Sequence, residues 1–303
     1  MTSPRSTSSS TPPTPRRRVE VEAVSTMTSV SGSRIRNAGR GAREGDIVVV
    51  KVGGSTLGEG DSTMPDLIAL QKQGLKPVVV HGGGKVISEW VRLQGIQPEF
   101  VRGLRKTDKP TLDVAIAVLC GLVNAQLVAE IMAAGGMAVG LAGVDGGMLK
   151  AEVLDPELGM VGRIIEADAS TITAVMETGA IPVIAPAALN VNPEQPDGSD
   201  RILNINADTS AGHVAAALGA AILVFQTDVS GVLDATRRLI PRMTRRQAKD
   251  LIDSGIANGG MIPKIEACAF AVETVRAGYI IDGRIAGALL ECVAGHNIGT
   301  RIT

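Results

Sequence analysis

Short apolar runs alternate with longer stretches of helical pattern from Asp46 to the end of the chain. The clearest runs are DIVVVKV, KPVVVHG, MAVGLAG, IPVIAPA, AILVFQTD and GYIIDG, which begin at residues 46, 76, 137, 181, 221 and 278. Strands that are apolar on both faces and separated by helices predict a mainly parallel sheet covered on both sides. We therefore expect an α/β fold, a three-layer αβα sandwich around a central open sheet. Residues 148–168, with the turn-like DPELG, interrupt the rhythm and predict a β-hairpin.

The first 45 residues have a different composition from the rest. Ser, Thr, Pro and Arg dominate, and a segment such as TPPTPRRR cannot contribute to a core. We expect residues 1–45 to form a disordered arm. Two alternatives remain open: an Arg-rich, acid-poor start also resembles an organelle transit peptide, and Met27 could be the true start of translation.

Composition argues against several classes of partner. The chain of 303 residues has 30 basic and 31 acidic side chains, so no global field attracts nucleic acid or an anionic membrane. One Trp, one Tyr and three Phe are too few for a base-stacking platform. No run approaches the roughly 20 apolar residues of a membrane helix. Cys120, Cys268 and Cys292 lack zinc-ligand spacing and fit a reducing compartment, so we expect a cytoplasmic protein.

Glycine-rich segments stand at several predicted strand ends, where open α/β sheets bind their ligands. These segments are KVGGS (51–55), HGGGK (81–85), GLAGVDGG (140–147), NINAD (204–208) and TDVSGV (227–232). In HGGG, glycines between a strand and a helix let backbone N–H groups approach an anion, and the helix N-terminus adds positive potential. A simple tight turn is the alternative. Neither the G-x-x-x-x-G-K-[ST] loop nor the dinucleotide-binding G-x-G-x-x-G is present, which disfavours a dehydrogenase.

Two lysines occupy unfavourable positions. Lys51 lies inside an apolar strand, and Lys264 lies near the positive end of a predicted helix that starts around Pro263. Each stands beside a Gly-Gly pair, so both are better explained by one polyanion that contacts them; a solvated surface lysine is the alternative for Lys264. Asp208 either caps the helix that follows it or bridges the two ammonium groups for phosphoryl transfer.

Three further polar residues are candidates for ligand contacts. Asn204 and Asn206 alternate on a predicted strand, so both can face one side and donate amide hydrogen bonds. Arg105 lies in a predicted irregular connection, where its guanidinium can bind a carboxylate with two hydrogen bonds. Because Arg102 and Lys106 are close by, a generic basic loop remains the alternative.

These pieces occur in an order that resembles the amino-acid kinase family, and within it the acetylglutamate kinases of arginine biosynthesis. The matching segments are KVGGS, VVVHGGGK, GLRKTD, NINAD, DVSGV, GGMIPKIEA and the C-terminal IIDGR, LLE and IGTRI, within residues 46–303. The resemblance implies the amino-acid kinase fold with two lobes: residues 46–200 for the acid substrate and dimerisation, and residues 201–303 for ATP. It implies ATP-dependent phosphorylation of the side-chain carboxylate of N-acetyl-L-glutamate, with Mg²⁺ held mainly by the phosphates and no metal site on the protein.

The resemblance also implies a role for each matching residue. Lys51 and Lys264 would stabilise the transition state, and Asp208 would organise them. The acid substrate would contact Gly83, Gly84, Arg105, Asn204 and Asn206. The transferring phosphoryl group would contact Gly53, Gly54 and Gly82. The nucleotide would contact Thr227, Asp228, Val229, Gly231, Gly260 and Met261. A carboxylate nucleophile needs no general base, which fits the absence of a catalytic Ser, Cys or His constellation.

Some features keep alternatives open. The segment from Gly54 to His81 is shorter than usual in this family, so the kinase acting on carrier-protein-bound α-aminoadipate in lysine biosynthesis is the nearest competitor. A non-catalytic nucleotide or amino-acid sensor is a different class, disfavoured by the joint presence of both lysines and Asp208. Residues 1–45 lack the apolar helix of arginine-inhibited hexamers in this family, and Gly287 and CVAGHN depart from the usual effector pattern. We predict a homodimer with weak or no arginine inhibition; nothing indicates a PII-type regulator.

Overall fold

The computed structural model describes residues 41–53, 62–195 and 197–303. The chain divides into two units, Met1–Ala38 and Gly39–Thr303, and every described element belongs to the second. The predicted disordered arm therefore lies almost entirely outside the described residues, and Gly54 lies outside them as well. The disorder of the arm and the phosphate contact of Gly54 stay predictions.

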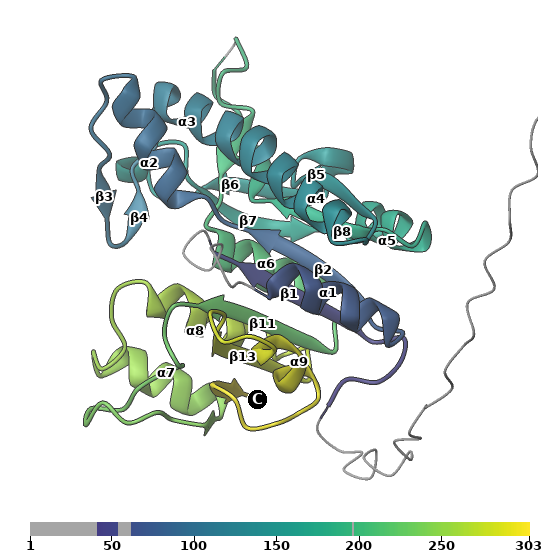
Figure 1. The fold of residues 1–303 in the computed structure, drawn as a ribbon. Coiled ribbons are helices and arrows are strands. Elements are labelled where there is room, and N and C mark those ends of the chain that lie inside the picture. Colours follow the sequence, from purple (N-terminus) through teal and green to yellow (C-terminus); the bar gives the residue numbers. More distant parts are fainter. Residues whose placement is uncertain (1–40, 54–61, 196) are drawn as a thin grey trace, which may run out of the picture. The chain divides into compact units, whose positions relative to one another are not determined.

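An eight-stranded sheet forms the centre of the described unit, with strand order β12-β14-β13-β11-β1-β2-β8-β5 (Figure 1). Its strands are β1 (Ile47–Val52), β2 (Lys76–His81), β5 (Ala138–Ala142), β8 (Ile181–Ala185), β11 (Ile222–Thr227), β12 (Arg242–Met243), β13 (Ala277–Asp282) and β14 (Thr300–Ile302). All neighbouring pairs are parallel except β13 and β14. The six apolar runs are confirmed as six adjacent strands; β12 and β14 were not predicted.

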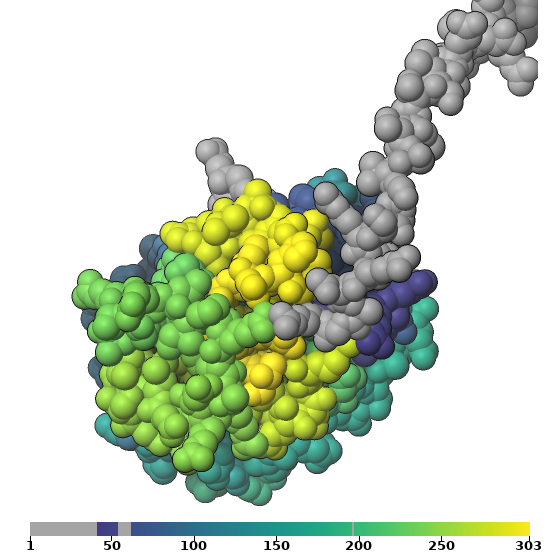
Figure 2. Space-filling view, turned by 90° about the horizontal axis from the view of Figure 1, so that it is seen from below, coloured from purple at the N-terminus to yellow at the C-terminus, as the bar shows by residue number. Residues whose placement is uncertain are grey.

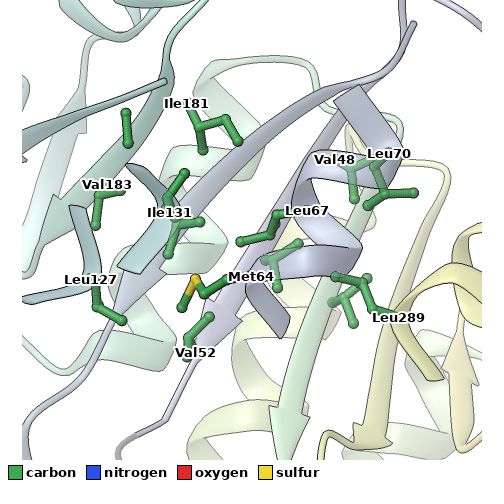
Figure 3. Close-up of a cluster of buried hydrophobic side chains, with 14 of the residues drawn as sticks. Val48, Val52, Met64, Leu67, Leu70, Leu127, Ile131, Ile181, Val183 and Leu289 are labelled. Carbon is green, nitrogen blue, oxygen red and sulfur yellow. The ribbon is translucent and has the colours of Figure 1, made fainter. Parts of the chain in front are cut away.

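Helices cover both faces of this sheet. On one face lie α1 (Thr63–Lys72), α2 (Gly84–Leu93), the continuous helix α3 (Lys109–Ile116), η1 (Ala117–Val123) and α4 (Asn124–Ala133), and α9 (Ala288–Val293). On the other lie α5 (Ser170–Glu177), α6 (Ala207–Ala217), α7 (Arg245–Asp253) and α8 (Met261–Ala271). Strand β1 supplies Val48, Val50 and Val52 to the first core, part of which Figure 3 shows, and Val49 to the second. The three-layer αβα sandwich is confirmed.

A second, four-stranded sheet has the order β10-β9-β6-β7. Its strands are β6 (Leu149–Val153), β7 (Gly162–Ala167), β9 (Ala187–Asn190) and β10 (Ile202–Asn204), with the short helix η2 (Asp145–Gly147) before β6. Strands β6 and β7 are antiparallel and are joined through the turn η3 (Pro156–Leu158), which confirms the hairpin predicted over residues 148–168.

A small hairpin places Arg105. Strands β3 (Phe100–Val101) and β4 (Leu104–Arg105) pair across a turn in which Arg102 and Gly103 have φ of 51° and 80°. The expectation that Arg105 lies in an irregular connection is wrong, because glycine at position 103 permits a tight two-residue turn and brings Arg105 opposite Phe100.

The helix Lys109–Ala133 corrects another expectation. Among the described residues it is long and apolar enough, by length and composition, to cross a membrane, although no apolar run of that length was expected. The core helix of a globular fold meets the same criterion. Here 44% of its most apolar window is buried within the fold, and Leu127 and Ile131 pack in the first core (Figure 3).

The predicted lobes share the central sheet. Residues 46–200 supply β1, β2, β5 and β8, and residues 201–303 supply β11 to β14, with β1 beside β11 at the junction. The C-terminal third, coloured green to yellow, forms most of the face seen in Figure 2. The division into an acid-binding and an ATP-binding lobe stays a prediction.

Candidate active site

The position of Lys51 follows from the pleat of β1. Side chains alternate along a strand, so Lys51 shares the face of Val49, which packs in the core under α6 and α8. Its neighbours on β2 and β11, Val80 and Phe225, belong to the same core. Only 8% of Lys51 is exposed. Its ammonium therefore extends from the end of a buried strand toward the first turn of α6.

Asp208 lies in that first turn, where the helix dipole favours a negative charge. Its Oδ1 is 2.9 Å from Lys51 Nζ, and its Oδ2 accepts a hydrogen bond of 2.9 Å from Lys264 Nζ. Burial by itself would raise the pKa of Asp208, but the ammonium groups of Lys51 and Lys264 lower it below the ordinary carboxyl value. Asp208 is thus an ionised bridge between the two lysines, as one of the two alternatives predicted.

The other alternative, that Asp208 caps α6, is wrong. Asn206 is the N-cap, and its side-chain oxygen accepts hydrogen bonds from the backbone N–H groups of Asp208 and Thr209. The expectation that Asn204 and Asn206 alternate on one strand is also wrong, because β10 ends at Asn204. The side chain of an extended Asn before a helix accepts hydrogen bonds from free N–H groups of the first helical turn. Asn206 therefore starts α6 and does not continue β10.

Lys264 reaches Asp208 from α8. This helix begins at Met261, so Pro263 lies within its first turn as predicted, and Lys264 Nζ also donates to the carbonyl of Gly260 at 3.1 Å. Two ammonium groups share one carboxylate, which leaves an excess positive charge at the end of β1. An excess positive charge near two helix N-termini is suited to a polyanion.

The HGGG segment lies next to these charges. The N–H of Gly82 donates to the Val52 carbonyl at 3.0 Å, and a Cβ on Gly82 would lie 3.9 Å from Lys51 Nζ. Gly83 is the N-cap of α2, and a Cβ there would lie 2.9 Å from Leu119 Cδ2. The first turn of α2 has no acidic side chain. The glycines thus permit close packing, and the N-terminus of α2 lacks an anionic partner of its own.

A cavity of about 330 Å³ connects these groups. Its lining contains Lys51, Gly53, Gly82, Gly83, Gly84, Lys85, Ile87, Phe100, Gly103, Leu104, Arg105, Leu119, Val161, Pro186, Asn204, Ile205, Asn206, Ala207 and Asp208. The structure therefore brings together all described residues that were predicted to contact the acid substrate or the phosphoryl group. Lys264 adjoins the cavity through Asp208.

Arg105 lies in the wall of this cavity with only 8% of its surface exposed. Its guanidinium packs 4.8 Å from the centroid of the Phe100 ring, and Nη2 donates to Gly84 O and Ser88 Oγ at 2.8 Å each. The buried Nη1 has no hydrogen-bond partner among the described residues. Burial, followed by the charge of Arg92, lowers the pKa of Arg105. A buried guanidinium nitrogen without a partner is suited to a carboxylate ligand.

Sequence reasoning missed the residues that hold this wall together. Thr107 Oγ1 donates to the Arg105 carbonyl at 2.8 Å and lies 3.3 Å from Asn204 Nδ2, which joins β4 to β10. Phe100, Leu119 and Val161 add apolar surface to the cavity. None of these residues has a sequence signal of its own, because each acts only after the hairpin β3–β4 has docked.

The predicted nucleotide residues lie elsewhere, and none of them lines this cavity. Thr227 ends β11, and its Oγ1 accepts from Val229 N at 3.2 Å. Gly231 has φ of 141°, and a Cβ there would lie 2.7 Å from both Leu239 Cδ1 and Thr300 Oγ1, so local packing already requires glycine. Gly260 and Met261 begin α8. The nucleotide-binding roles of Thr227, Asp228, Val229, Gly231, Gly260 and Met261 stay predictions.

The described residues do not fit a resident metal ion. Among them, no group of three or more His, Cys, Asp or Glu side chains converges. Asp208 is the one carboxylate in the described lining of the cavity, and two ammonium groups already hold it.

Fold and site together define a class, and comparison with known proteins identifies it. Residues 46–282 match the model of the amino acid kinase family, and the chain belongs to this family. The predicted resemblance is confirmed.

The curated relatives belong to one member class of this family, the acetylglutamate kinases. The acetylglutamate kinase of Dehalococcoides mccartyi is 41% identical over 256 residues, which cover 84% of this chain and 94% of that protein. The acetylglutamate kinase of Caldanaerobacter subterraneus subsp. tengcongensis is 44% identical over 268 residues, covering 85% and 87%. Among solved structures, smu.665 from Streptococcus mutans UA159 has a TM-score of 0.72 and 29% identity, covering 85% of this chain and 98% of that one. Carbamate kinase from Giardia lamblia bound to AMP-PNP shares the fold, with a TM-score of 0.58 at 18% identity, covering 85% and 98%.

Proposed function

We propose that this chain transfers the γ-phosphoryl group of ATP to the side-chain carboxylate of N-acetyl-L-glutamate, forming N-acetyl-L-glutamyl 5-phosphate in the second step of arginine biosynthesis. The observation that carries the proposal is the Lys51–Asp208–Lys264 cluster at a glycine-lined cavity. The curated acetylglutamate kinases, at 41% and 44% identity, support the substrate. They do not favour the carrier-bound α-aminoadipate alternative. A cytoplasmic location is part of the proposal.

The reaction needs no proton transfer. A carboxylate oxygen of the substrate forms a bond to the γ-phosphorus while the bond from that phosphorus to the β–γ bridging oxygen breaks, and ADP leaves with the electron pair. The obstacle is repulsion between an anionic nucleophile and an anionic phosphate chain, so positioning and charge stabilisation carry the catalysis. A cavity lined by Lys51 and Lys85, with Lys264 adjoining it through Asp208, is suited to this chemistry.

In this mechanism Lys51 and Lys264 offset charge on the transferring phosphoryl group, and Asp208 holds both ammonium groups in a fixed orientation. Backbone N–H groups at Gly83 and Gly84 supply further donors. Magnesium bound to the phosphate oxygens of ATP would supply additional charge neutralisation; no described residue is assigned to hold it.

The acid substrate would occupy the other half of the cavity. Arg105 offers a buried Nη1 without a hydrogen-bond partner among the described residues, and Asn204 lines the same cavity. An arginine is suited to the α-carboxylate, because its planar fork binds two carboxylate oxygens at once. The side-chain carboxylate would then extend toward Lys51 and Gly83.

Hydroxylamine trapping tests the function directly. Purified protein, ATP, Mg²⁺ and hydroxylamine should give acyl hydroxamate with N-acetyl-L-glutamate and far less with L-glutamate, whose free ammonium replaces the neutral acetamido group. Folded, ATP-binding protein that forms no hydroxamate from acetylglutamate would refute the proposal. Turnover of carrier-bound α-aminoadipate would then identify the competing kinase, and ATP binding without any turnover would identify a sensor.

A further inference from the structure

The last residue of β2, His81, lies immediately before the three glycines of the site and is only 1% exposed. Alternation along β2 places it on the face of Val79, which is the opposite face of the sheet from Lys51. Its Nδ1 lies 3.0 Å from the carbonyl oxygen of Gly82, and its Nε2 lies 3.1 Å from Nδ2 of Asn124 at the start of α4. The ring thus bridges the glycine segment and a core helix.

The neighbours of Asn124 determine which nitrogen carries the proton. Asn124 Nδ2 also donates to the Val183 carbonyl at 2.9 Å, so exchanging the amide oxygen and nitrogen would bring two acceptors together. The amide oxygen lies against Gly140, where an added Cβ would be only 1.9 Å from it. Because Nδ2 can only donate, Nε2 must accept, and the proton resides on Nδ1 and is donated to Gly82.

The charge state agrees with this tautomer. Burial, with a smaller contribution from the charge of Lys51, lowers the pKa of His81 to about 4 despite the opposing effect of its hydrogen bond with Gly82. The ring is therefore neutral near pH 7, with one donor and one acceptor nitrogen, each of which has a partner.

A π-helical turn aligns the partners. The segment η1 (Ala117–Val123) interrupts an otherwise continuous α-helix and ends immediately before Asn124. A π-turn adds one residue and rotates the following side chains by roughly 100° relative to an uninterrupted α-helix, and such turns are frequent at functional sites. Here Leu119 of η1 packs against Gly83, while Asn124 faces His81.

We propose that His81 and Asn124 are positioning residues that aim the backbone N–H of Gly83 at the transferring phosphoryl group. The carbonyl of Gly82 and the N–H of Gly83 belong to one planar trans peptide and point in opposite directions. Holding the carbonyl at His81 therefore directs the N–H away from the ring, and Gly83 lines the cavity. The role of this donor in phosphoryl transfer rests on the proposed function. The hydrogen bonds that join Gly82, His81 and Asn124 do not.

Two substitutions at one position separate the hydrogen bond from packing. His81→Asn keeps an N–H donor near the place of Nδ1 and should retain kcat within about threefold, whereas His81→Leu removes the donor. Misplacing a catalytic group by about 1 Å costs on the order of 100-fold, so His81→Leu should lower kcat by about that factor while the KM values change little. Circular dichroism and thermal unfolding measure whether both variants fold. Equal kcat in both variants, or a loss confined to KM, would overturn the inference.

Nitrogen NMR on the wild-type protein tests the tautomer without any substrate. The chain has three histidines, so ¹⁵N-histidine labelling gives a simple spectrum in which His81 is assigned by its disappearance in His81→Asn. At pH 7 we expect a proton on Nδ1 and a bare Nε2; an Nε2–H tautomer or a doubly protonated ring overturns the inference. Failure of the hydroxamate assay with the expected NMR result would reject the proposed function alone.

Discussion

A single carboxylate at Asp208 holds two ammonium groups that would otherwise repel each other. Lys51 comes from a buried strand and Lys264 from the first turns of a helix, and each is 2.9 Å from a different oxygen of Asp208. Long lysine side chains have many rotamers, and a shared anion reduces that freedom. In our mechanism Asp208 does not touch the phosphate, but it determines where Lys51 and Lys264, which do, are placed.

Asp208→Asn should therefore impair both catalysis and stability. We expect kcat to fall by at least about 100-fold, as for loss of a preorganised charge-stabilising group. Since the buried Lys51 and the partly buried Lys264 lose their anion, we expect the free energy of unfolding at pH 7 to fall by about 3 kcal/mol. Steady-state kinetics and urea denaturation measure the two effects.

The pH dependence of stability supplies a further check on this variant. Folding lowers the pKa of Asp208, so its stabilising contribution is present above the ordinary carboxyl pKa of about 4 and is lost as pH falls through the folded value. The difference between wild type and Asp208→Asn should shrink in acid. Asp113→Asn, which removes an exposed partner of Lys109, is the matched control and should change stability by less than about 1 kcal/mol. A difference that stays constant from pH 7 into acid would contradict the ion-pair account.

The sequence was sufficient to predict the charged residues because each conflicts with its own surroundings. An ammonium in an apolar strand and another at a helix N-terminus are unfavourable without an anion, and this conflict is local. Thr107 and Phe100 show no such conflict, and their roles depend on contacts with Asn204 and Arg105 that form only when distant segments dock. The prediction placed Asn206 on a strand, although it is the N-cap of α6, because an Asn at this point fits both a strand position and a helix cap.

Side chains of helix α4 pack directly against strand β5 at Gly140. A Cβ at this glycine would lie 1.9 Å from Asn124 Oδ1 and 3.4 Å from Val128 Cγ2. Small side chains on such a strand allow a helix to pack close to the sheet. The packing of α4 against β5 also positions Asn124 next to His81, so a change at Gly140 affects the geometry of the site.

Gly140→Ala should therefore destabilise the fold by about 1–3 kcal/mol, the usual cost of overpacking, and lower the melting temperature by several degrees. Gly121→Ala is the matched control: it lies on the exposed side of η1, and its added Cβ meets nothing within 4 Å. That substitution should leave stability unchanged or raise it by about 0.5–1 kcal/mol. Differential scanning calorimetry compares the two, and equal melting temperatures would contradict the packing argument.

At the level of elements, apolar periodicity predicted the long buried strands and failed for the short ones. Strand β11 is buried along all six residues, so its sequence is continuously apolar except near its end. Strands β12 and β3 have two residues each, too few to establish any alternation. The π-turn in η1 is likewise invisible to a pattern with a 3.6-residue period.

The whole molecule, we propose, works as a homodimer that arginine does not inhibit strongly. Several large apolar side chains of the described surface remain exposed on α2 and α4, including Trp90, Leu93 and Met132. Such side chains are suited to a subunit interface. Residues 1–45 lack the apolar stripe that would join dimers into a hexamer.

Size-exclusion chromatography with light scattering should give a mass of twice the chain's 31.2 kDa, unchanged when arginine is added. The hydroxamate assay with increasing arginine should show little loss of rate. An arginine-dependent hexamer, or inhibition at low arginine concentration, would refute this proposal. Leu93→Glu on the exposed side of α2 should weaken the dimer if that surface forms the interface, and Lys249→Glu, which also introduces an exposed glutamate but on α7, is the control.

The central place of β1 has a consequence for synthesis of the chain. Strand β1 emerges from the ribosome first among the strands of the large sheet, but it pairs on one side with β11, which follows roughly 170 residues later. At translation rates of about 5–20 residues per second, that side of an apolar strand stays unpaired for on the order of ten seconds or more. An unpaired apolar strand edge is a template for association with other chains. The arrangement that places Lys51 at the centre of the sheet thus leaves one edge of β1 open to other chains until β11 has been synthesised.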